Sequence, residues 1–228
     1  MDFSEVVRRR RMVRSYTDEP VDPAALDRVL AAGQRAPSAG FTQGWGFLVL
    51  DTPEQTANFW NATFPDLEAR EGFRWRGLFA APVIVVPFSH RDAYLDRYAE
   101  PDKGWTDRDA DRWPVPYWHI DTGFAAMAML LAVVDEGLGA LFFGIFGEHV
   151  DELRATFGVP EAFTPIGAIT IGHPAPRPAF SLARPRPPTD RAGHPPRPLV
   201  ATRGPAGRRL WARVRRGRRD RRRASPRR

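Results

Sequence analysis

The chain has 228 residues, of which 43% are hydrophobic, so it is long enough to bury one substantial core. It contains no cysteine, which excludes disulfides, thiolate metal ligands and thiol nucleophiles. Residues 191–228 hold fifteen Arg and one Asp, a net charge of +14, so the total of +7 leaves −7 for residues 1–190. The basic charge belongs to the C-terminal tail and does not indicate that the folded part binds nucleic acid.

Two helices are expected at the N-terminal end. The first has apolar residues at helical spacing from Phe3 to Val7, and the arginines that follow suit the negative end of its dipole. The second begins at Asp22-Pro23, an N-cap followed by proline at the first helical position, and it ends before Pro37.

The later core segments alternate irregularly between strand and helix. We expect strands at 47–50, 81–88, 141–146 and 166–171, and helices at 54–60, 120–134 and 148–157. Residues 120–134 are apolar nearly all round, as expected of a helix buried in a large core or in a dimer. Because helices outnumber strands and alternate irregularly with them, the sequence predicts an α+β fold.

Residues 101–118 combine four aromatic side chains with three prolines and show no clean period, so we interpret them as an insertion or lid. Within them, Trp105 and Trp113 either stack on an aromatic substrate or cover the edge of a core, and the sequence leaves both open. The longest apolar run, residues 123–134, is too short to span a bilayer, and the first five residues lack a basic leader. We therefore expect a cytoplasmic protein without a membrane segment.

Two segments are candidates for binding. The first is Arg10-Arg11-Met12-Val13-Arg14-Ser15-Tyr16, although an arginine run on a helix is usually a solvated face, because successive residues rotate by about 100° and cannot all meet one anion. The second is Pro37-Ser38-Ala39-Gly40-Phe41-Thr42-Gln43, which closes a helix and leads through small residues into an apolar strand. Taken alone, the second segment is more typical of an ordinary helix-to-strand turn than of a binding site.

Together these segments resemble the flavin-binding signature of the nitroreductase family, whose members carry FMN and transfer hydride from NAD(P)H. The resemblance covers residues 1–186 and includes the segments 137–145 and 165–174. It implies a central, mainly antiparallel sheet flanked by helices, with a long buried core helix. It also implies a homodimer whose two flavin sites lie at the subunit interface. The cofactor-binding residues that it implies are Arg10, Arg11, Met12, Arg14, Pro37, Ser38, Ala39, Phe41, Gln43, Phe143, Gly144, Arg184 and Arg186.

By this resemblance, Arg10 and Arg11 reach the phosphate side of FMN, and Arg14 reaches the pyrimidine edge, where the reduced ring develops negative charge. The resemblance further implies that Ser38 and Ala39 offer main-chain groups to the ring and that Gln43 offers a side-chain amide. The sequence departs from the family pattern at three positions: Met12 replaces a common Ser, Phe41 a common Asn and Gly44 a common Pro. The departure at Phe41 affects the expected substrate preference more than the expected cofactor. We expect Phe41, Trp105 and Trp113 to lie near the substrate.

The implied activity is hydride transfer from NAD(P)H through flavin N5 to a small electron-poor acceptor such as a nitroaromatic, a quinone or an enone. The flavin carries this chemistry, so no catalytic side chain is named. The alternatives are a specialised family reaction, such as reductive dehalogenation or flavin fragmentation, and a nucleic-acid-binding protein that acts through its basic tail. The five histidines show no metal-ligand spacing with Asp or Glu, and no metal site is predicted.

Residues 187–228 change abruptly to Arg, Pro, Gly and Ala. Such a segment buries too little apolar surface to offset its ordering entropy, so we predict a disordered tail after a folded domain of residues 1–186. One hypothesis is that a GC-rich gene is read out of frame from about this point. The alternative is a genuine basic tail that binds polyanions nonspecifically.

Overall fold

The computed structural model describes residues 1–176, 199–203 and 209–213. The chain divides into two units, Met1–Ala179 and Phe180–Arg228. The first unit therefore ends a few residues before the expected domain end at residue 186.

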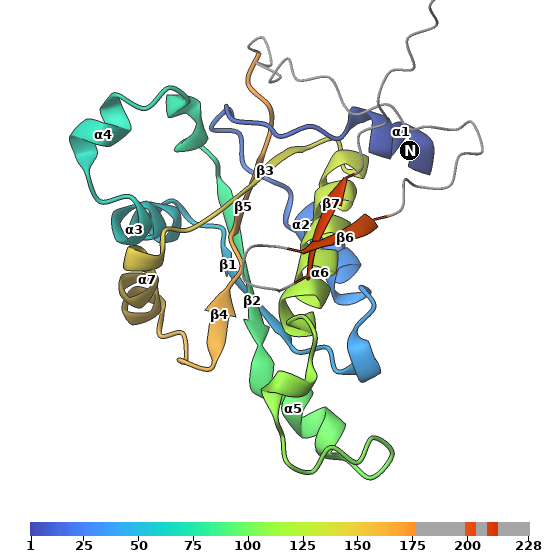
Figure 1. The fold of residues 1–228 in the computed structure, drawn as a ribbon. Helices are drawn as coiled ribbons and strands as arrows, with labels where there is room; N and C mark the ends of the chain where they lie inside the picture. Colours follow the sequence, from blue (N-terminus) through green and yellow to red (C-terminus); the bar gives the residue numbers. More distant parts are fainter. Residues whose placement is uncertain (177–198, 204–208, 214–228) are drawn as a thin grey trace, which may run out of the picture. The chain divides into compact units, whose positions relative to one another are not determined.

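A five-stranded sheet forms the centre of the first unit (Figure 1). Its strands are β1 (Trp45–Leu50), β2 (Val83–His90), β3 (Gly139–Phe143), β4 (Phe163–Pro165) and β5 (Ala168–Gly172). They lie in the order β1-β2-β5-β3, with β4 beside β2, and every pair of strands is antiparallel. The antiparallel α+β fold is thus confirmed.

Helices cover both faces of the sheet. The helices of the first unit are α1 (Phe3–Arg9), α2 (Pro23–Gln34), α3 (Pro53–Thr63), α4 (Leu67–Glu71), α5 (Arg91–Ala99), α6 (Tyr117–Asp135) and α7 (Val150–Phe157). The expected helices are confirmed, and the side chain of Asp22 accepts a hydrogen bond from the Ala24 amide as an N-cap. Helices α4 and α5 were not predicted, because α4 has only five residues and α5 is rich in charge, with no apolar stripe to reveal it.

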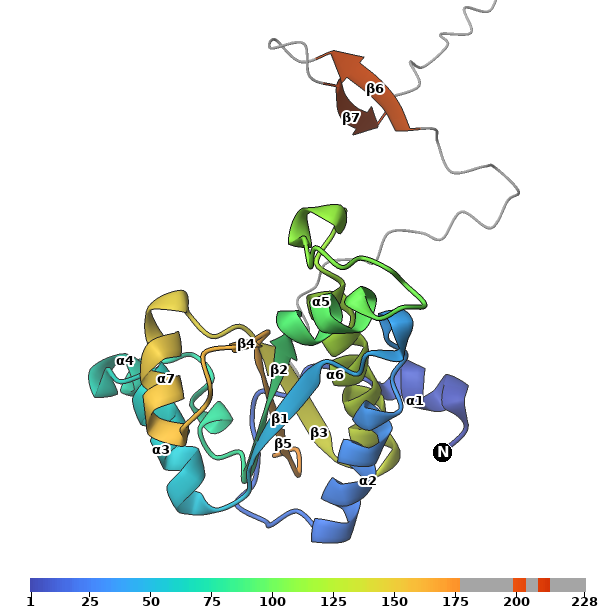
Figure 2. The same ribbon diagram turned by 90° about the horizontal axis from the view of Figure 1, so that it is seen from below.

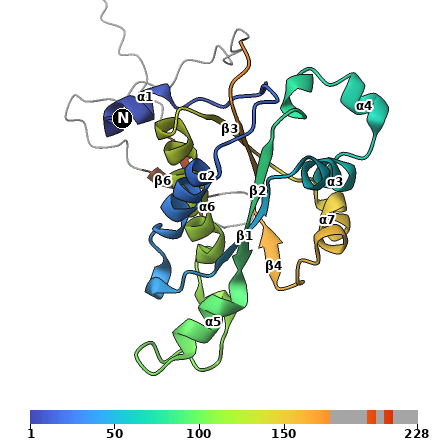
Figure 3. The same ribbon diagram turned by 180° about the vertical axis from the view of Figure 1, so that it is seen from behind.

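Alternation along β2 divides the buried side chains between two cores. Val83 and Val85 face α2 and α6, where Val29 and Met129 are fully buried. Ile84, Val86 and Phe88 point to the opposite face, toward α3 and α7. Figures 2 and 3 show these two helix pairs on opposite sides of the sheet.

Helix α6 is the core helix. With 19 residues and a mean hydropathy of 1.4 over its most apolar window, it is long and apolar enough to cross a membrane, which corrects the expectation that no segment has that length. The helix starts earlier than its apolar run, at Tyr117. Its buried residues Ala126, Met129 and Val133 pack against α2 and the sheet, as in the core helix of a globular protein.

The second unit contains a described antiparallel pair of strands, β6 (Leu199–Arg203) and β7 (Arg209–Arg213). These strands lie where the sequence predicted disorder, and the rest of the predicted disordered tail lies outside the described residues. An isolated two-stranded hairpin is only marginally stable in water.

Candidate cofactor site

The arginine run is divided by the end of α1. Arg8 and Arg9, on the helix, both pair with Glu5, and the Arg8 Nη2 to Glu5 Oε1 distance is 2.5 Å. Their hydrogen bonds, that of Arg8 foremost, lower the pKa of Glu5 to about 2. Arg10 and Arg11 follow the helix, and neither forms an ion pair with an acidic side chain within the described part of the chain. The structure therefore separates two cations that share an acidic partner from two that are available to an anion.

Past the helix, the chain runs beside β3 and places Arg14 over an indole ring. The Val13 amide donates to the Ala140 carbonyl at 2.8 Å, and the Met12 side chain packs into the core. Arg14 Cζ lies 5.0 Å from the ring centroid of Trp75, and Arg14 Nη1 donates to the Met12 carbonyl at 3.3 Å. These contacts fix the direction of the guanidinium.

Trp75 is a site residue that the sequence reasoning missed. Arg74 also lies over its ring, with Cζ 5.4 Å from the centroid, so the indole is flanked by two guanidinium groups. The signal in the sequence was the triplet Arg74-Trp75-Arg76, in which a large aromatic side chain stands between two cations. This arrangement gives the site near Arg14 a positive potential that suits an anionic ligand.

The second segment forms a turn in an unusual backbone conformation. Gly40, Phe41 and Gln43 have φ angles of 64°, 56° and 52°. For a residue other than glycine this left-handed region costs about 1–3 kcal/mol, and such residues cluster at functional sites. Phe41 is also 77% exposed, the largest exposed fraction among the large apolar side chains of the described residues.

Helices α5 and α6 hold this turn from behind. The Ala39 amide donates to Asp121 Oδ2 at 2.8 Å, and the Tyr94 hydroxyl donates to the same oxygen at 2.9 Å. Arg97 Nε donates to the Gly40 carbonyl at 2.9 Å. Burial and, secondarily, the hydrogen bond to Asp121 raise the pKa of Tyr94. Asp121 was not predicted from the sequence. It could have been found as an acidic residue within an otherwise apolar helix.

Some expected ligand groups of the turn are already used within the chain. The Ala39 amide is bound to Asp121, and the Ala39 carbonyl accepts from the amide and hydroxyl of Thr42. The Ser38 hydroxyl oxygen accepts from the Gln43 amide at 2.9 Å. This differs from the expectation that Ala39 offers main-chain groups to the ring, because these groups stabilise the turn itself. Pro37 lies between α2 and the turn, and the side-chain amide of Gln43 borders a cavity.

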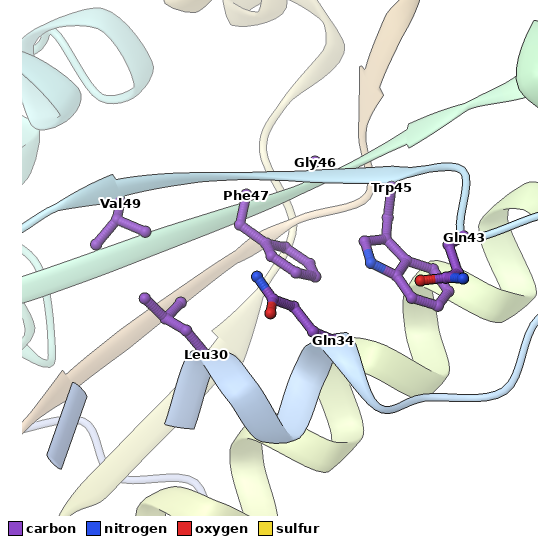
Figure 4. Close-up of a pocket in the computed structure, with 7 residues that line it drawn as sticks. All are labelled: Leu30, Gln34, Gln43, Trp45, Gly46, Phe47 and Val49. Carbon is purple, nitrogen blue, oxygen red and sulfur yellow. The ribbon is translucent and has the colours of Figure 1, made fainter. Parts of the chain in front are cut away.

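That cavity, of about 420 Å³, lies between α2 and β1 (Figure 4). It is lined by Leu30, Gln34, Gln43, Trp45, Gly46, Phe47 and Val49. Figure 4 shows the rings of Trp45 and Phe47 projecting from the strand toward Gln34 on the helix. Two aromatic rings with two amide groups suit a flat ligand with polar edges.

The two predicted binding segments lie at opposite ends of the sheet (Figures 1 and 3). The first lies where β2 begins, since the Tyr16 amide donates to the Gly77 carbonyl, and the Val13 amide donates to Ala140 of β3, which is level with Val83 across β5. The second lies where β2 ends, since the His90 amide donates to the Gly44 carbonyl at 2.9 Å. The structure does not bring these two segments together within one chain.

The remaining predicted positions are distributed as follows. The Phe143 ring stacks on Trp60 with centroids 5.7 Å apart, so its side chain belongs to the core. A Cβ added at Gly144 would meet nothing within 4 Å, so its backbone is open to a neighbour. Arg184 and Arg186 lie outside the described residues.

The two lid tryptophans pack in an aromatic cluster on α5. The Trp113 centroid lies 4.5 Å from that of Tyr98 and 5.5 Å from that of Trp105. Both tryptophans are half-buried. These contacts describe a cover over α5, and contact with a substrate stays a prediction. Within the described residues no group of three His, Asp or Glu side chains is placed to bind a metal.

Known proteins resemble this chain over most of its length. A protein of Methanothermobacter thermautotrophicus, provisionally named NADH dehydrogenase/NAD(P)H nitroreductase, is 27% identical over 181 residues, which are 78% of this chain and 80% of that protein. A nitroreductase of Exiguobacterium sibiricum, also provisionally named and solved with FMN, has a TM-score of 0.59 at 21% identity and covers 83% of this chain and 93% of its own.

An FMN-dependent nitroreductase of Clostridium difficile has a TM-score of 0.55 at 22% identity, covering 74% of this chain and 86% of its own. At these identities the solved structures establish the fold. The family model named Nitroreductase family matches residues 7–173, which contain all of the sheet and both predicted binding segments. By this match, the chain belongs to the nitroreductase family.

Proposed function

We propose that the protein is an FMN-dependent oxidoreductase that passes hydride from NAD(P)H to an electron-poor acceptor such as a nitroaromatic, a quinone or an enone. Family membership supports the reaction class, and the name of the archaeal relative and the FMN-bound neighbour support the cofactors. The observation that carries the proposal is the separation of Arg10 and Arg11 from the Glu5-paired Arg8 and Arg9.

The donors of this chain fit the cofactor. Arg10 and Arg11 offer forked guanidinium donors, which match the oxygens of a phosphate dianion. Arg14, held over Trp75, offers a fixed positive charge for the flavin ring. When bound, FMN supplies the hydride chemistry at N5, so the protein need only orient the reactants and stabilise charge.

A homodimer accounts for the separation of the two binding segments. If each site draws on two chains, the arginines of one copy can meet the turn of the other without any rearrangement within a chain. Helix α6 offers a surface for such a contact, because apolar side chains at helical spacing are 36–49% exposed along it. These side chains are Tyr117, Ile120, Phe124 and Met127.

The acceptor site is proposed to lie near Phe41. Its ring is exposed on a turn that the backbone holds in one conformation, so it is preorganised to stack on a planar acceptor. Trp105 and Trp113 are proposed to border the same site from the lid segment.

The test is to reconstitute the purified full chain with FMN and measure its absorption spectrum, its flavin content and its oxidation of NADH and NADPH. We expect about one noncovalent FMN per chain and reduction of a nitroaromatic or quinone acceptor. Sedimentation measurements are expected to give a dimer. A chain that stays colourless after reconstitution would contradict the proposal.

A further inference from the structure

The carboxylate of Asp121 is buried in the middle of an apolar helix. It is 2% exposed and is the only buried acidic or basic side chain in the described part of the chain. No ion pair with a described cation compensates it, and its hydrogen bonds come from the Ala39 amide and the Tyr94 hydroxyl. A buried carboxylate is costly unless such donors stabilise it, so its position requires a reason.

The turn in front of Asp121 needs external support. Phe41 and Gln43 both occupy the left-handed backbone region, which side chains disfavour. Such a conformation persists only where the surroundings determine it. Asp121 and Ala39 are 82 positions apart in the sequence, so their hydrogen bond is a tertiary contact and not a local helix cap.

The side chains of α5 complete this support. Arg97 donates to the Gly40 carbonyl and is itself held by Asp102, with Arg97 Nη1 2.7 Å from Asp102 Oδ1. A Cβ added at Gly40 would lie 2.8 Å from the Tyr98 ring. A Cβ at Gly44 would lie 2.5 Å from the Tyr94 ring, so the two glycines let the turn approach the helix closely.

We propose that Asp121 is a positioning residue: by fixing the Ala39 amide and the Tyr94 hydroxyl, it holds the turn of residues 38–43 in the conformation that binds FMN. This inference rests on the proposed function, because the turn is part of the proposed cofactor site. Asp121 itself does not touch the cofactor in this arrangement. Its negative charge strengthens both hydrogen bonds, and one oxygen serves both donors.

The experiment compares four variants of the full chain. Asp121→Ala removes the acceptor, Asp121→Asn keeps an acceptor oxygen without the charge, and Tyr94→Phe removes one donor while keeping the ring. Thr122→Val is the matched control, because Thr122 is fully buried on the same helix but donates only to the carbonyl of Trp118. Each variant is measured by hydrogen exchange of the 37–44 peptide without FMN and by the dissociation constant for FMN.

We expect Asp121→Ala to speed exchange at Ala39 at least tenfold and to weaken FMN binding about ten- to a hundredfold, the loss of a charge-assisted hydrogen bond. Asp121→Asn is expected to give intermediate values of both, because it keeps an acceptor oxygen but loses the charge that strengthens the two bonds. Thr122→Val is expected to leave both unchanged, whatever its effect on global stability. If Asp121→Ala does not fold, Tyr94→Phe decides the question, with faster exchange and weaker FMN binding expected.

Two results would overturn the inference. One is unchanged exchange of the 37–44 peptide in folded Asp121→Ala and Tyr94→Phe, which would show that the turn holds itself. The other is faster exchange with unchanged FMN affinity, which would limit Asp121 to the structure of the turn. A wild-type chain that binds no FMN would instead refute the proposed function, so the two failures are distinguishable.

Discussion

Replacing Arg11 and Arg8 separately by alanine tests whether the division of the arginine run has a function. Both changes remove one positive charge from adjacent turns of the chain. Arg8 is bound to Glu5 through Nε at 2.6 Å and Nη2 at 2.5 Å, whereas Arg11 is exposed and forms no ion pair within the described residues. The two variants therefore have the same net charge and differ in which cation is removed.

We expect Arg11→Ala to weaken FMN binding by about 1.5–3 kcal/mol, the range for a hydrogen bond to a charged group. This corresponds to roughly a ten- to hundredfold larger dissociation constant. Arg8→Ala changes only the distant field, which salt screens beyond about 8 Å at physiological ionic strength, so its effect is expected to stay below about twofold.

The assay is a titration of the apoprotein with FMN, followed by flavin fluorescence at fixed ionic strength. Circular dichroism of both variants checks that α1 is intact. Equal weakening by the two substitutions would show that only the total charge matters. No weakening by Arg11→Ala would refute its assignment to the phosphate.

Three further predictions concern the scaffold. A Cβ at Gly33 would lie 2.3 Å from Met129 Cε, so Gly33→Ala is expected to lower the free energy of unfolding by about 1–3 kcal/mol. A Cβ at Gly123 would meet nothing within 4 Å, so Gly123→Ala is expected to raise the free energy of unfolding by up to about 1 kcal/mol. Urea denaturation measures both changes. Burial lowers the pKa of His119 in the folded chain, so the free energy of unfolding is expected to fall as the pH drops below about 6.5. The fall is expected to be smaller in His119→Gln. Equal dependence of unfolding free energy on pH in the variant and the wild type would contradict this. Trp113→Ala is expected to lower the free energy of unfolding by about 3 kcal/mol, because it removes a ring from the aromatic cluster. It is also expected to change the KM of the acceptor more than that of NAD(P)H. Unchanged acceptor kinetics would mean that Trp113 serves only in packing.

The sequence by itself determined the elements whose signals are local. Asp22-Pro23 marks the start of α2 because capping depends on residues within one turn. The apolar run at residues 81–88 predicts β2 because a strand covered on both faces is apolar throughout. The two predicted binding segments also rest on contiguous residues; the family match includes both, and their contact with a cofactor stays a prediction.

Only the tertiary structure decided how those residues are used. The end of α1 at Arg9, the indole of Trp75 under Arg14, and the carboxylate of Asp121 behind Ala39 depend on packing between distant parts of the chain. Local propensity carries no information on such pairs, since each partner has the same neighbours in sequence whether or not they meet. The opposite placement of the two predicted binding segments follows from α2, a 12-residue helix between them in the chain, since one segment precedes its first turn and the other follows its last.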